Sequence, residues 1–198
     1  MKYVLATANP GKITEMREVL SPLGIDVISR KELGIETEID ENGSTFYENA
    51  LIKAEFISKI SGMPAIADDS GLVVEALNGE PGLYTSTYGG EDLNNEERCA
   101  FLLRNMEKVE QRGAKFVCTI VCVYPDGKIL SAQGECAGKI VMSPRGSNGF
   151  GYDPVFAPHG SSKTLAEILP EEKNAISHRG KALREFAKQL GVSSGERG

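Results

Sequence analysis

In the first part of the chain, apolar residues recur at helical spacing between two short runs that are typical of strands. The runs Lys2–Thr7 and Ile25–Ser29 predict strands. The segment between them predicts a helix, because its apolar residues lie three or four positions apart; Asn9 and Pro10 begin this helix and Gly24 ends it. The apolar positions of this helix are Ile13, Met16, Leu20 and Leu23.

The next part carries a second predicted helix and two more apolar runs. Thr45 and Glu48 form a Thr-x-x-Glu capping box, which predicts the start of the helix. Its apolar face consists of Phe46, Ala50, Ala54 and Ile57. The runs Pro64–Ala67 and Leu72–Leu77 then predict two strands, with a turn at Asp68–Gly71 because Asp, Ser and Gly favour turns.

Strands dominate the prediction after a glycine-rich loop at Gly79–Gly90 and a helix at Glu91–Met106. Lys115–Tyr124 is rich in β-forming residues, and a turn at Pro125–Lys128 leads to two further strand segments within Ile129–Val141. The last predicted elements are a polar loop at Ser143–Pro154, a short helix that begins at Thr164, and a final helix that Ser177 caps and Gly191 ends.

Helices and strands that alternate early and strands that cluster late predict an α/β protein. We expect a mixed central sheet with flanking helices and two lobes around an active-site cleft. Residues 1–191 would form this single two-lobed domain, and residues 192–198 would be a flexible tail.

Composition narrows the classes of function. The net charge of −6 disfavours nucleic-acid binding, although a local cationic pocket could still hold a phosphate ligand. The four cysteines include no Cys-x-x-Cys pair and there are two histidines, so a zinc site is not predicted. The apolar run Tyr3–Ala6 is too short for a signal peptide or a membrane span, so we expect a cytoplasmic protein with no membrane partner and with reduced cysteines.

Asp68 and Asp69 form the first candidate site. Two adjacent carboxylates beside a buried strand are costly to desolvate without a positive partner, and hard carboxylate oxygens suit Mg²⁺. The alternative is an ordinary Asp-rich turn.

Two further segments could bind an anion. Thr7–Lys12 lies at a strand-to-helix junction, where backbone N–H groups and the Lys12 ammonium attract negative charge; the alternative is an ordinary capped helix. Lys53 lies one helical turn after Asn49, and the alternative for this lysine is a solvated helix face.

Two segments in the second half could recognise a base. Gly149–Phe156 carries aromatic residues between glycines, so that Phe150 could stack on a nucleobase, or the aromatic residues could pin the loop to the core. Lys173–Arg179 leads into the last helix with cationic side chains that oppose the helix dipole, which favours an anionic or carbonyl-bearing ligand over a plain capped helix. His178 and Arg179 can donate hydrogen bonds to base carbonyls.

Together these segments resemble the inosine triphosphate pyrophosphatase family, whose members hydrolyse non-standard purine nucleoside triphosphates. The matching motifs, which span Thr7 to about Leu183, are Thr7-x-Asn9-x-x-Lys12, Thr45-Phe46-x-Glu48-Asn49-Ala50 with Lys53, Ala67-Asp68-Asp69-Ser70-Gly71-Leu72, Gly149-Phe150-Gly151-Tyr152-Asp153-Pro154-x-Phe156 and Lys173-x-x-x-Ser177-His178-Arg179. Two positions depart from the usual pattern. Ala8 replaces a glycine, which is tolerable if its φ is negative, and Thr87 replaces an arginine.

The resemblance implies Mg²⁺-dependent cleavage between the α- and β-phosphates, which yields a nucleoside monophosphate and pyrophosphate. It implies that ITP, dITP and XTP are better substrates than ATP and GTP. It also implies a homodimer.

In the resulting hypothesis, Asp69 binds Mg²⁺ and accepts a proton from the attacking water, while Asp68 and Asn49 support it. An acidic residue from the 36–41 loop, with Asp40 as the first choice, would complete the metal shell. The residues expected to contact the substrate are Thr7, Ala8, Asn9, Pro10, Gly11, Lys12, Lys53, Ser70, Phe150, Gly151, Tyr152, Asp153, Lys173, His178 and Arg179. His178 and Arg179 would pair with the C6 carbonyl of the base, so Arg179→Ala is expected to reduce ITP hydrolysis far more than thermal stability.

Two other functions stay open at this point. A non-catalytic nucleotide sensor would need the aromatic loop and the basic helix start, but not the acidic pair. A pyrophosphatase of modified pyrimidine triphosphates would differ in its substrates, and a panel of nucleotides would distinguish it.

Overall fold

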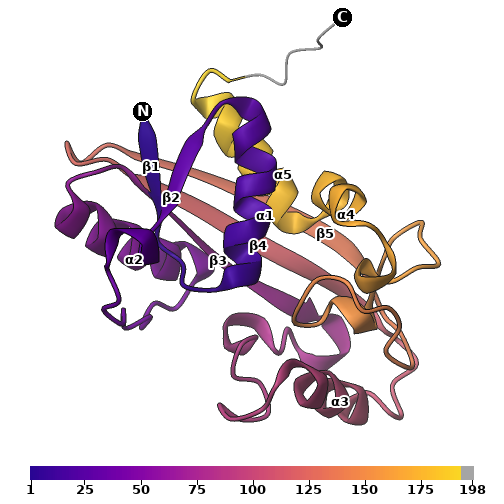
Figure 1. Ribbon diagram of the computed structural model, residues 1–198. Helices are drawn as coiled ribbons and strands as arrows, with labels where there is room; N and C mark the ends of the chain where they lie inside the picture. The colour runs from indigo at the N-terminus through magenta and orange to yellow at the C-terminus, as the bar shows by residue number, and fades with distance from the viewer. Residues whose placement is uncertain (193–198) are drawn as a thin grey trace, which may run out of the picture. The chain divides into compact units, whose positions relative to one another are not determined.

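The computed structural model describes residues 1–192, which form five α-helices and six strands (Figure 1). In chain order these are β1 (Lys2–Leu5), α1 (Pro10–Leu20), β2 (Asp26–Ser29), α2 (Phe46–Ser61), β3 (Ala65–Val74), α3 (Asn95–Asn105), β4 (Gly113–Val123), β5 (Ile129–Ile140), β6 (Phe156–Pro158), α4 (Pro170–Ile176) and α5 (His178–Gln189). The predicted tail lies outside the described residues from position 193 onward.

The strands form one sheet in the order β2-β1-β3-β4-β5-β6. The sheet is mixed, because β1 pairs in parallel with both β2 and β3, whereas β5 and β6 are antiparallel. The prediction of an α/β fold with a mixed sheet and flanking helices is confirmed.

The chain divides into two compact units. Unit 1 contains Met1–Asp69, Cys118–Gly134 and the segment from His178 onward, and unit 2 contains Ser70–Val117 and Glu135–Ser177. The boundaries fall inside β3, β4 and β5, so each of these strands contributes residues to both units. The single two-lobed domain with a cleft stays a prediction.

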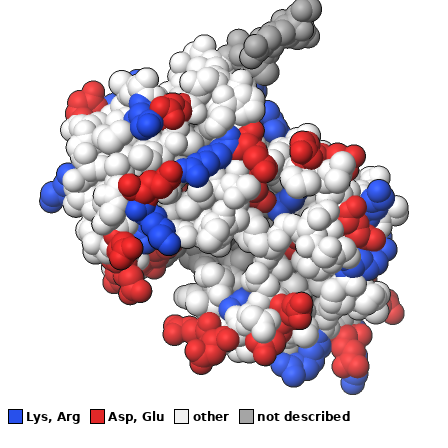
Figure 2. Space-filling model, viewed as in Figure 1, with Lys and Arg blue, Asp and Glu red and all other residues white. Residues whose placement is uncertain are grey.

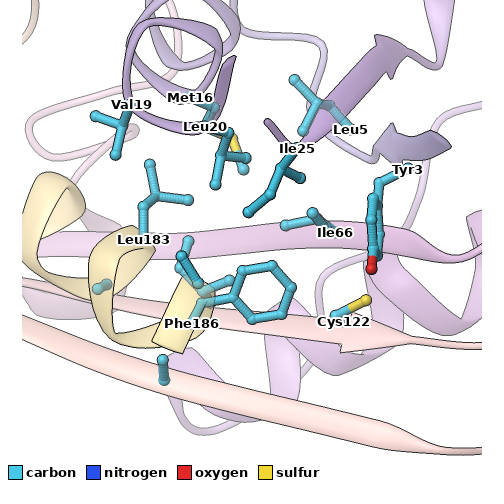
Figure 3. Packing of buried hydrophobic residues seen from close by; sticks show 14 of the residues in the cluster. Tyr3, Leu5, Met16, Val19, Leu20, Ile25, Ile66, Cys122, Leu183 and Phe186 are labelled. Carbon is cyan, nitrogen blue, oxygen red and sulfur yellow. The ribbon is translucent and has the colours of Figure 1, made fainter. Parts of the chain in front are cut away.

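In unit 1, the helices cover both faces of the strands, and the alternation of side chains along each strand decides which face a residue joins. On one face, Leu183 and Phe186 of α5 pack with Met16 and Leu20 of α1 (Figure 3). The strand residues in this core are Tyr3, Leu5, Ile66, Cys118, Ile120, Cys122 and Ala132. On the other face, α2 packs through Ala50, Ala54 and Ile57 against Val4, Ala6, Ala65, Ala67, Val121 and Val123.

Unit 2 has a core of its own. Leu102 and Met106, at the end of α3, are fully buried in a cluster with Phe156 of β6. The rings of Phe116 and Phe156 meet at 4.8 Å between centroids, in an edge-on arrangement.

The largest error of the prediction lies in β3. It is one extended strand through Asp68, Asp69, Ser70 and Gly71, not two strands joined by a turn, and Gly71 does not take a positive φ. An extended conformation is tolerated at the acidic pair because cationic side chains lie within ion-pair distance of both carboxylates. In the same way, β5 is one strand instead of two segments.

Two helix starts also differ from the prediction. α3 begins at Asn95 instead of Glu91, because Asn94 and Glu97 form a capping box. Thr164 begins a single 3₁₀ turn, and α4 starts only at Pro170. At α2, Thr45 accepts from the N–H of Glu48 as predicted, and the Glu48 carboxylate also accepts from the N–H of Ser44.

Acidic and basic side chains are interspersed on the face of the molecule that Figure 2 shows. Among residues 1–192, none of the helices combines the length and the hydrophobicity that a membrane span requires.

Candidate active site

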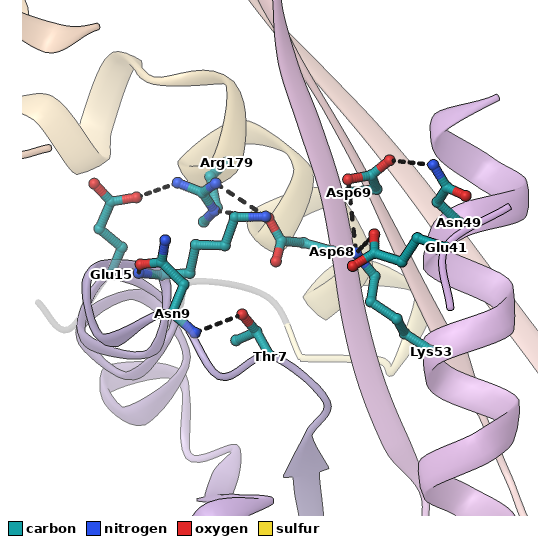
Figure 4. Close-up of polar contacts among 10 residues, drawn as sticks. Thr7, Asn9, Glu15, Glu41, Asn49, Lys53, Asp68, Asp69 and Arg179 are labelled. Atoms are coloured by element: carbon teal, nitrogen blue, oxygen red, sulfur yellow. Dashed lines mark hydrogen bonds and ion pairs between the residues drawn. The ribbon is translucent and has the colours of Figure 1, made fainter. Parts of the chain in front are cut away.

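Asp68 and Asp69 point to opposite faces of β3 (Figure 4). Alternation along the strand requires this, because Ile66 belongs to the core under α1 and α5, whereas Ala67 belongs to the core under α2. One segment of chain therefore delivers a carboxylate to each side of the sheet in unit 1.

Asp68 lies in a buried cationic environment. Its Oδ2 atom is 3.0 Å from the Lys12 ammonium, and it accepts from Nε and Nη2 of Arg179 at 3.2 and 3.1 Å. Burial opposes ionisation of this side chain, but Lys12 and Arg179 outweigh it and hold the pKa of Asp68 well below its usual range. Asp68 is therefore a carboxylate at any pH at which the protein would work.

Arg179 is committed to carboxylates on two elements. Besides Asp68, its Nη1 atom donates to Glu15 of α1, and the arginine is only 2% exposed. Asp68 and Glu15 raise the pKa of the guanidinium against the opposing effect of burial. This geometry gives Arg179 a structural role in the cluster, and the predicted hydrogen bond to a base carbonyl stays a prediction.

Glu15 was not selected from the sequence. It lies one helical turn before Val19, and both residues are buried in α1. An acidic residue on a packed helix face needs a cationic partner. The position of Glu15 on the predicted helix was therefore the one signal in the sequence that could have indicated its ion pair.

The segment Thr7–Lys12 forms the predicted capped start of α1. The N–H of Lys12 donates to Asn9 Oδ1 at 3.1 Å, and the N–H of Asn9 donates to Thr7 Oγ1 at 3.2 Å. Ala8 does not take a positive φ, so its replacement of the family's usual glycine is accommodated. Ala8, Asn9 and Pro10 are exposed and accessible to a ligand.

Asp69 faces α2. Its Oδ2 atom accepts from Asn49 Nδ2 at 3.2 Å, and Oδ1 lies 3.6 Å from the Lys53 ammonium. Burial raises the pKa of Asp69, and the nearby Lys53 and Lys12 offset this only in part. The pKa values of the two adjacent aspartates are therefore shifted in opposite directions.

Lys53 is buried, so the alternative of a solvated helix face is wrong. Its ammonium lies 2.6 Å from Glu41 as well as near Asp69. Although burial favours the neutral amine, Asp69, Asp68 and Glu41 together raise the pKa of Lys53. Glu41 lies in the 36–41 loop from which the sequence prediction takes an acidic residue, but Asp40 is the residue that the prediction prefers, and both are exposed.

Asp69 and Glu41 supply hard carboxylate oxygens of the kind that Mg²⁺ prefers, whereas the Asn49 oxygen accepts from the N–H of Gly43. Both carboxylates, those of Asp69 and Glu41, already lie near the positive charge of Lys53. Within residues 1–192, no three His, Cys, Asp or Glu side chains converge as a ready-made metal site. The donor set therefore fits a divalent cation that brings its own water or phosphate ligands.

In unit 2, Phe150, Asp153 and Lys173 come together. The Lys173 ammonium donates to Asp153 Oδ2, and it lies 4.9 Å from the centre of the Phe150 ring. The N–H of Phe150 donates to the same Asp153 oxygen at 2.8 Å. Asp153 and Lys173 are both buried, and Phe150 is half-buried.

The aromatic loop is also attached to the core, as the alternative for this segment held. Tyr152 is buried and its hydroxyl donates to the carbonyl of Thr85 at 3.1 Å, and Phe156 is fully buried. The anchored tyrosine leaves the half-buried Phe150 as the ring available for a ligand. Ser70 and Gly151 are half-buried, and His178 is buried at the start of α5.

The mixed α/β sheet, with a carboxylate on each face of β3, Lys12 in the first turn of α1 and Lys53 on α2, suits a hydrolase of anionic substrates. More particularly, the chain belongs to the Ham1 family, whose sequence model matches residues 3–189.

Its relatives support this membership over nearly the whole chain. The dITP/XTP pyrophosphatase of Thermus thermophilus is 49% identical over 186 residues, which cover 93% of this chain and 89% of the relative. The dITP/XTP pyrophosphatase of Haemophilus influenzae is 49% identical over 193 residues, which cover 96% and 98%. The solved structure of a HAM1 protein from Coxiella burnetii has a TM-score of 0.87 at 42% identity and covers 98% of this chain and 100% of its own. The Staphylococcus aureus Ham1 protein has a TM-score of 0.86 at 39% identity, with coverage of 96% and 98%.

Proposed function

We propose that the protein hydrolyses non-standard purine nucleoside triphosphates (ITP, dITP and XTP) to the nucleoside monophosphate and pyrophosphate. The observation that carries this proposal is the pair Asp68, buried, and Asp69, partly buried, which point to opposite faces of β3 with Lys12 and Lys53 beside them. The names of the relatives in Thermus and Haemophilus support the same substrates.

The triphosphate would bind the cationic groups of unit 1. The Lys12 side chain is 17% exposed, so its ammonium can reach a ligand while it pairs with Asp68. The exposed start of α1 adds the positive end of a helix dipole. Lys53 would neutralise further phosphate charge.

Asp69 would act as the general base. Asn49 and Lys53 hold its two oxygens at 3.2 and 3.6 Å, and a carboxylate positioned in this way can accept the proton of an attacking water. In this step the water proton passes to an Asp69 oxygen, a new O–P bond forms, and the anhydride bond between the α- and β-phosphates breaks. The electron pair of that bond leaves with pyrophosphate.

Mg²⁺ would be held by Asp69 and by a second carboxylate from the acidic loop. The sequence selects Asp40 for this role, but the contact of Glu41 with Lys53 favours Glu41. When bound, the ion would neutralise charge on the phosphate oxygens.

The purine base of the substrate would bind to the cluster of Phe150, Asp153 and Lys173 in unit 2. Phe150 would stack on the purine, and Lys173 would donate to a carbonyl while Asp153 holds its ammonium. His178 stays a further candidate donor. Adenine has an amino group where hypoxanthine has the C6 carbonyl, so these donors would be left unpaired and ATP would be a poor substrate.

We also infer a homodimer in the cytoplasm, with no nucleic-acid or membrane partner. The family resemblance supports the dimer, and the net charge of −6 argues against nucleic-acid binding.

Pyrophosphate release tests the proposal. With Mg²⁺, ITP, dITP and XTP should be hydrolysed far faster than ATP and GTP, and excess EDTA should stop the reaction. Asp69→Asn should lower kcat by about 10²–10⁴-fold, the range for loss of a general base, whereas Asp92→Asn in an exposed loop should not change it.

Each alternative has its own outcome in this assay. Binding of ITP without pyrophosphate release would indicate a sensor. Preference for modified pyrimidine triphosphates would move the protein to the other hydrolase class. Full activity of Asp69→Asn would refute the assigned base.

A further inference from the structure

The carboxamide of Asn49 lies between the acidic loop and the proposed catalytic carboxylate. Asn49 is on the first turns of α2 and is 6% exposed. Its Oδ1 atom accepts from the backbone N–H of Gly43 at 2.8 Å, and its Nδ2 atom donates to Asp69 Oδ2 at 3.2 Å. A single side chain therefore contacts two segments that are distant in sequence.

The partners of Asn49 fix its orientation. A backbone N–H can only donate, so it must meet the carboxamide oxygen, and an ionised carboxylate can only accept, so it must meet the nitrogen. The carboxamide carries the acceptor and the donor on separate atoms, so substitution can remove both functions or keep an acceptor alone.

A second contact holds the same loop two residues away. Glu41 pairs with Lys53 at 2.6 Å, and Lys53 lies one helical turn after Asn49 and 3.6 Å from Asp69. The loop is thus attached to the helix at Glu41 and at Gly43, and both attachments involve residues that also contact Asp69.

Gly43 allows this close approach. A Cβ atom at position 43 would lie 2.7 Å from Asn49 Oδ1 and 2.7 Å from Glu48 Cβ, which is closer than real Cβ contacts permit. Because the helix backbone around Glu48 and Asn49 cannot yield, a larger residue at position 43 would push the loop away from the Asn49 carboxamide.

We propose that Asn49 is a positioning residue that couples the acidic loop to Asp69. When the Gly43 contact is made, the carboxamide is held with its nitrogen toward Asp69 and orients that carboxylate. When the loop is displaced, the carboxamide can rotate and Asp69 loses its orienting donor. The catalytic consequence rests on the proposed function, whereas the coupling itself does not.

Hydrogen exchange in the metal-free, substrate-free protein tests the loop contact. In Asn49→Leu, which removes both hydrogen bonds, the Gly43 amide should exchange about tenfold faster, as expected for loss of one hydrogen bond. In Asn49→Asp, which keeps an acceptor, its rate should stay close to that of the wild type. Asn105→Ala is the matched control, because it removes a carboxamide that bonds Tyr88 in unit 2 and should leave Gly43 unchanged.

Gly43→Ala tests the coupling from the loop side. The side-chain NH₂ resonances of Asn49, which report on its bond to Asp69, should shift and exchange faster in this variant. Asn49→Leu, Asn49→Asp and Gly43→Ala should all lower kcat for ITP by about 10–100-fold, within the range over which misplacing a catalytic group acts, with KM changed less than threefold because Asn49 contacts neither phosphate nor base.

Unchanged Gly43 exchange in Asn49→Leu, or unchanged Asn49 NH₂ resonances in Gly43→Ala, would overturn the coupling whether or not the protein hydrolyses ITP. An inactive wild type with both spectroscopic changes present would overturn the proposed function and keep the coupling.

Discussion

Replacing Arg179 by Leu should destabilise the protein strongly. The guanidinium is the shared partner of Asp68 and Glu15, and all three residues are buried in unit 1. Leucine removes the positive charge and leaves two carboxylates that must be hydrated or protonated. The sequence predicts that a change at Arg179 reduces ITP hydrolysis far more than thermal stability, and the ion pairs of Arg179 add an expected loss of stability.

The size of the effect follows from what remains around the two carboxylates. Removing one partner of a buried ion pair costs about 3–5 kcal/mol. Lys12 stays 3.0 Å from Asp68, and the Glu15 side chain is 10% exposed and can reach water, so we expect the lower end, about 3 kcal/mol. For a chain of this length each kcal/mol lowers Tm by about 2–4 °C, which gives a fall of about 6–12 °C.

Urea unfolding followed by circular dichroism at pH 7.5 measures this loss. Arg17→Leu is the matched control, because Arg17 pairs with Glu32 where the side chains are 40% and 51% exposed, and such surface pairs contribute about 0–1 kcal/mol. Glu15→Gln in the Arg179→Leu background should recover about 1 kcal/mol, because it removes one of the two buried carboxylates that faced the guanidinium. A loss in Arg179→Leu no larger than that in Arg17→Leu would refute the reasoning.

Three further outcomes are expected. Gly149→Ala should raise KM for ITP about tenfold in steady-state assays. The φ angle of Gly149 is +74°, and the new Cβ would lie 2.0 Å from Asp153 Oδ2 and displace that carboxylate. An unchanged KM would argue against Phe150, Asp153 and Lys173 as the site of the purine base. The folded pKa of Asp68 is depressed, so its contribution to the free energy of unfolding is complete above its unfolded value of about 3.9 and is lost as pH falls through the lower folded value. The stability difference between wild type and Asp68→Asn should therefore stay constant above about pH 5 and shrink as pH falls from there to pH 3, and a constant difference over that lower range would contradict the assignment. Burial raises the pKa of the Cys118 thiol to about 12 and all four cysteines are buried, so a thiol reagent at pH 8 should label the native protein slowly and the unfolded protein fully, whereas rapid native labelling would indicate local opening.

Hydrophobic spacing was sufficient to predict β1, α1, β2 and α2 of unit 1, but not the full extent of β3 and β5. The apolar residues on one face of α1 and the alternating residues of β4 lie in the cores of the folded protein, as their spacing in the sequence predicts. The capped start of α1 at Asn9 was equally local, since one side chain and one N–H decide it.

Contacts between segments that are distant in sequence could not be predicted from hydrophobic spacing. Local composition at Asp68–Gly71 favours a turn, but Lys12 and Arg179, which stabilise the buried carboxylate of an extended strand, come from other parts of the chain. The contact of Glu41 with Lys53 could not be predicted either. Side chains in an irregular loop do not alternate in direction as they do along a strand, so the sequence does not show which acidic residue faces α2.

The placement of the two aspartates on successive positions of β3 restricts how this protein can diverge. Inserting or deleting one residue between Ala65 and Asp68 would put the strand out of phase and exchange the carboxylate facing α1 with the one facing α2. Changes of length should therefore be accepted in the surface loops, such as the turn at Pro125–Lys128, while β3 is free to vary only by substitution.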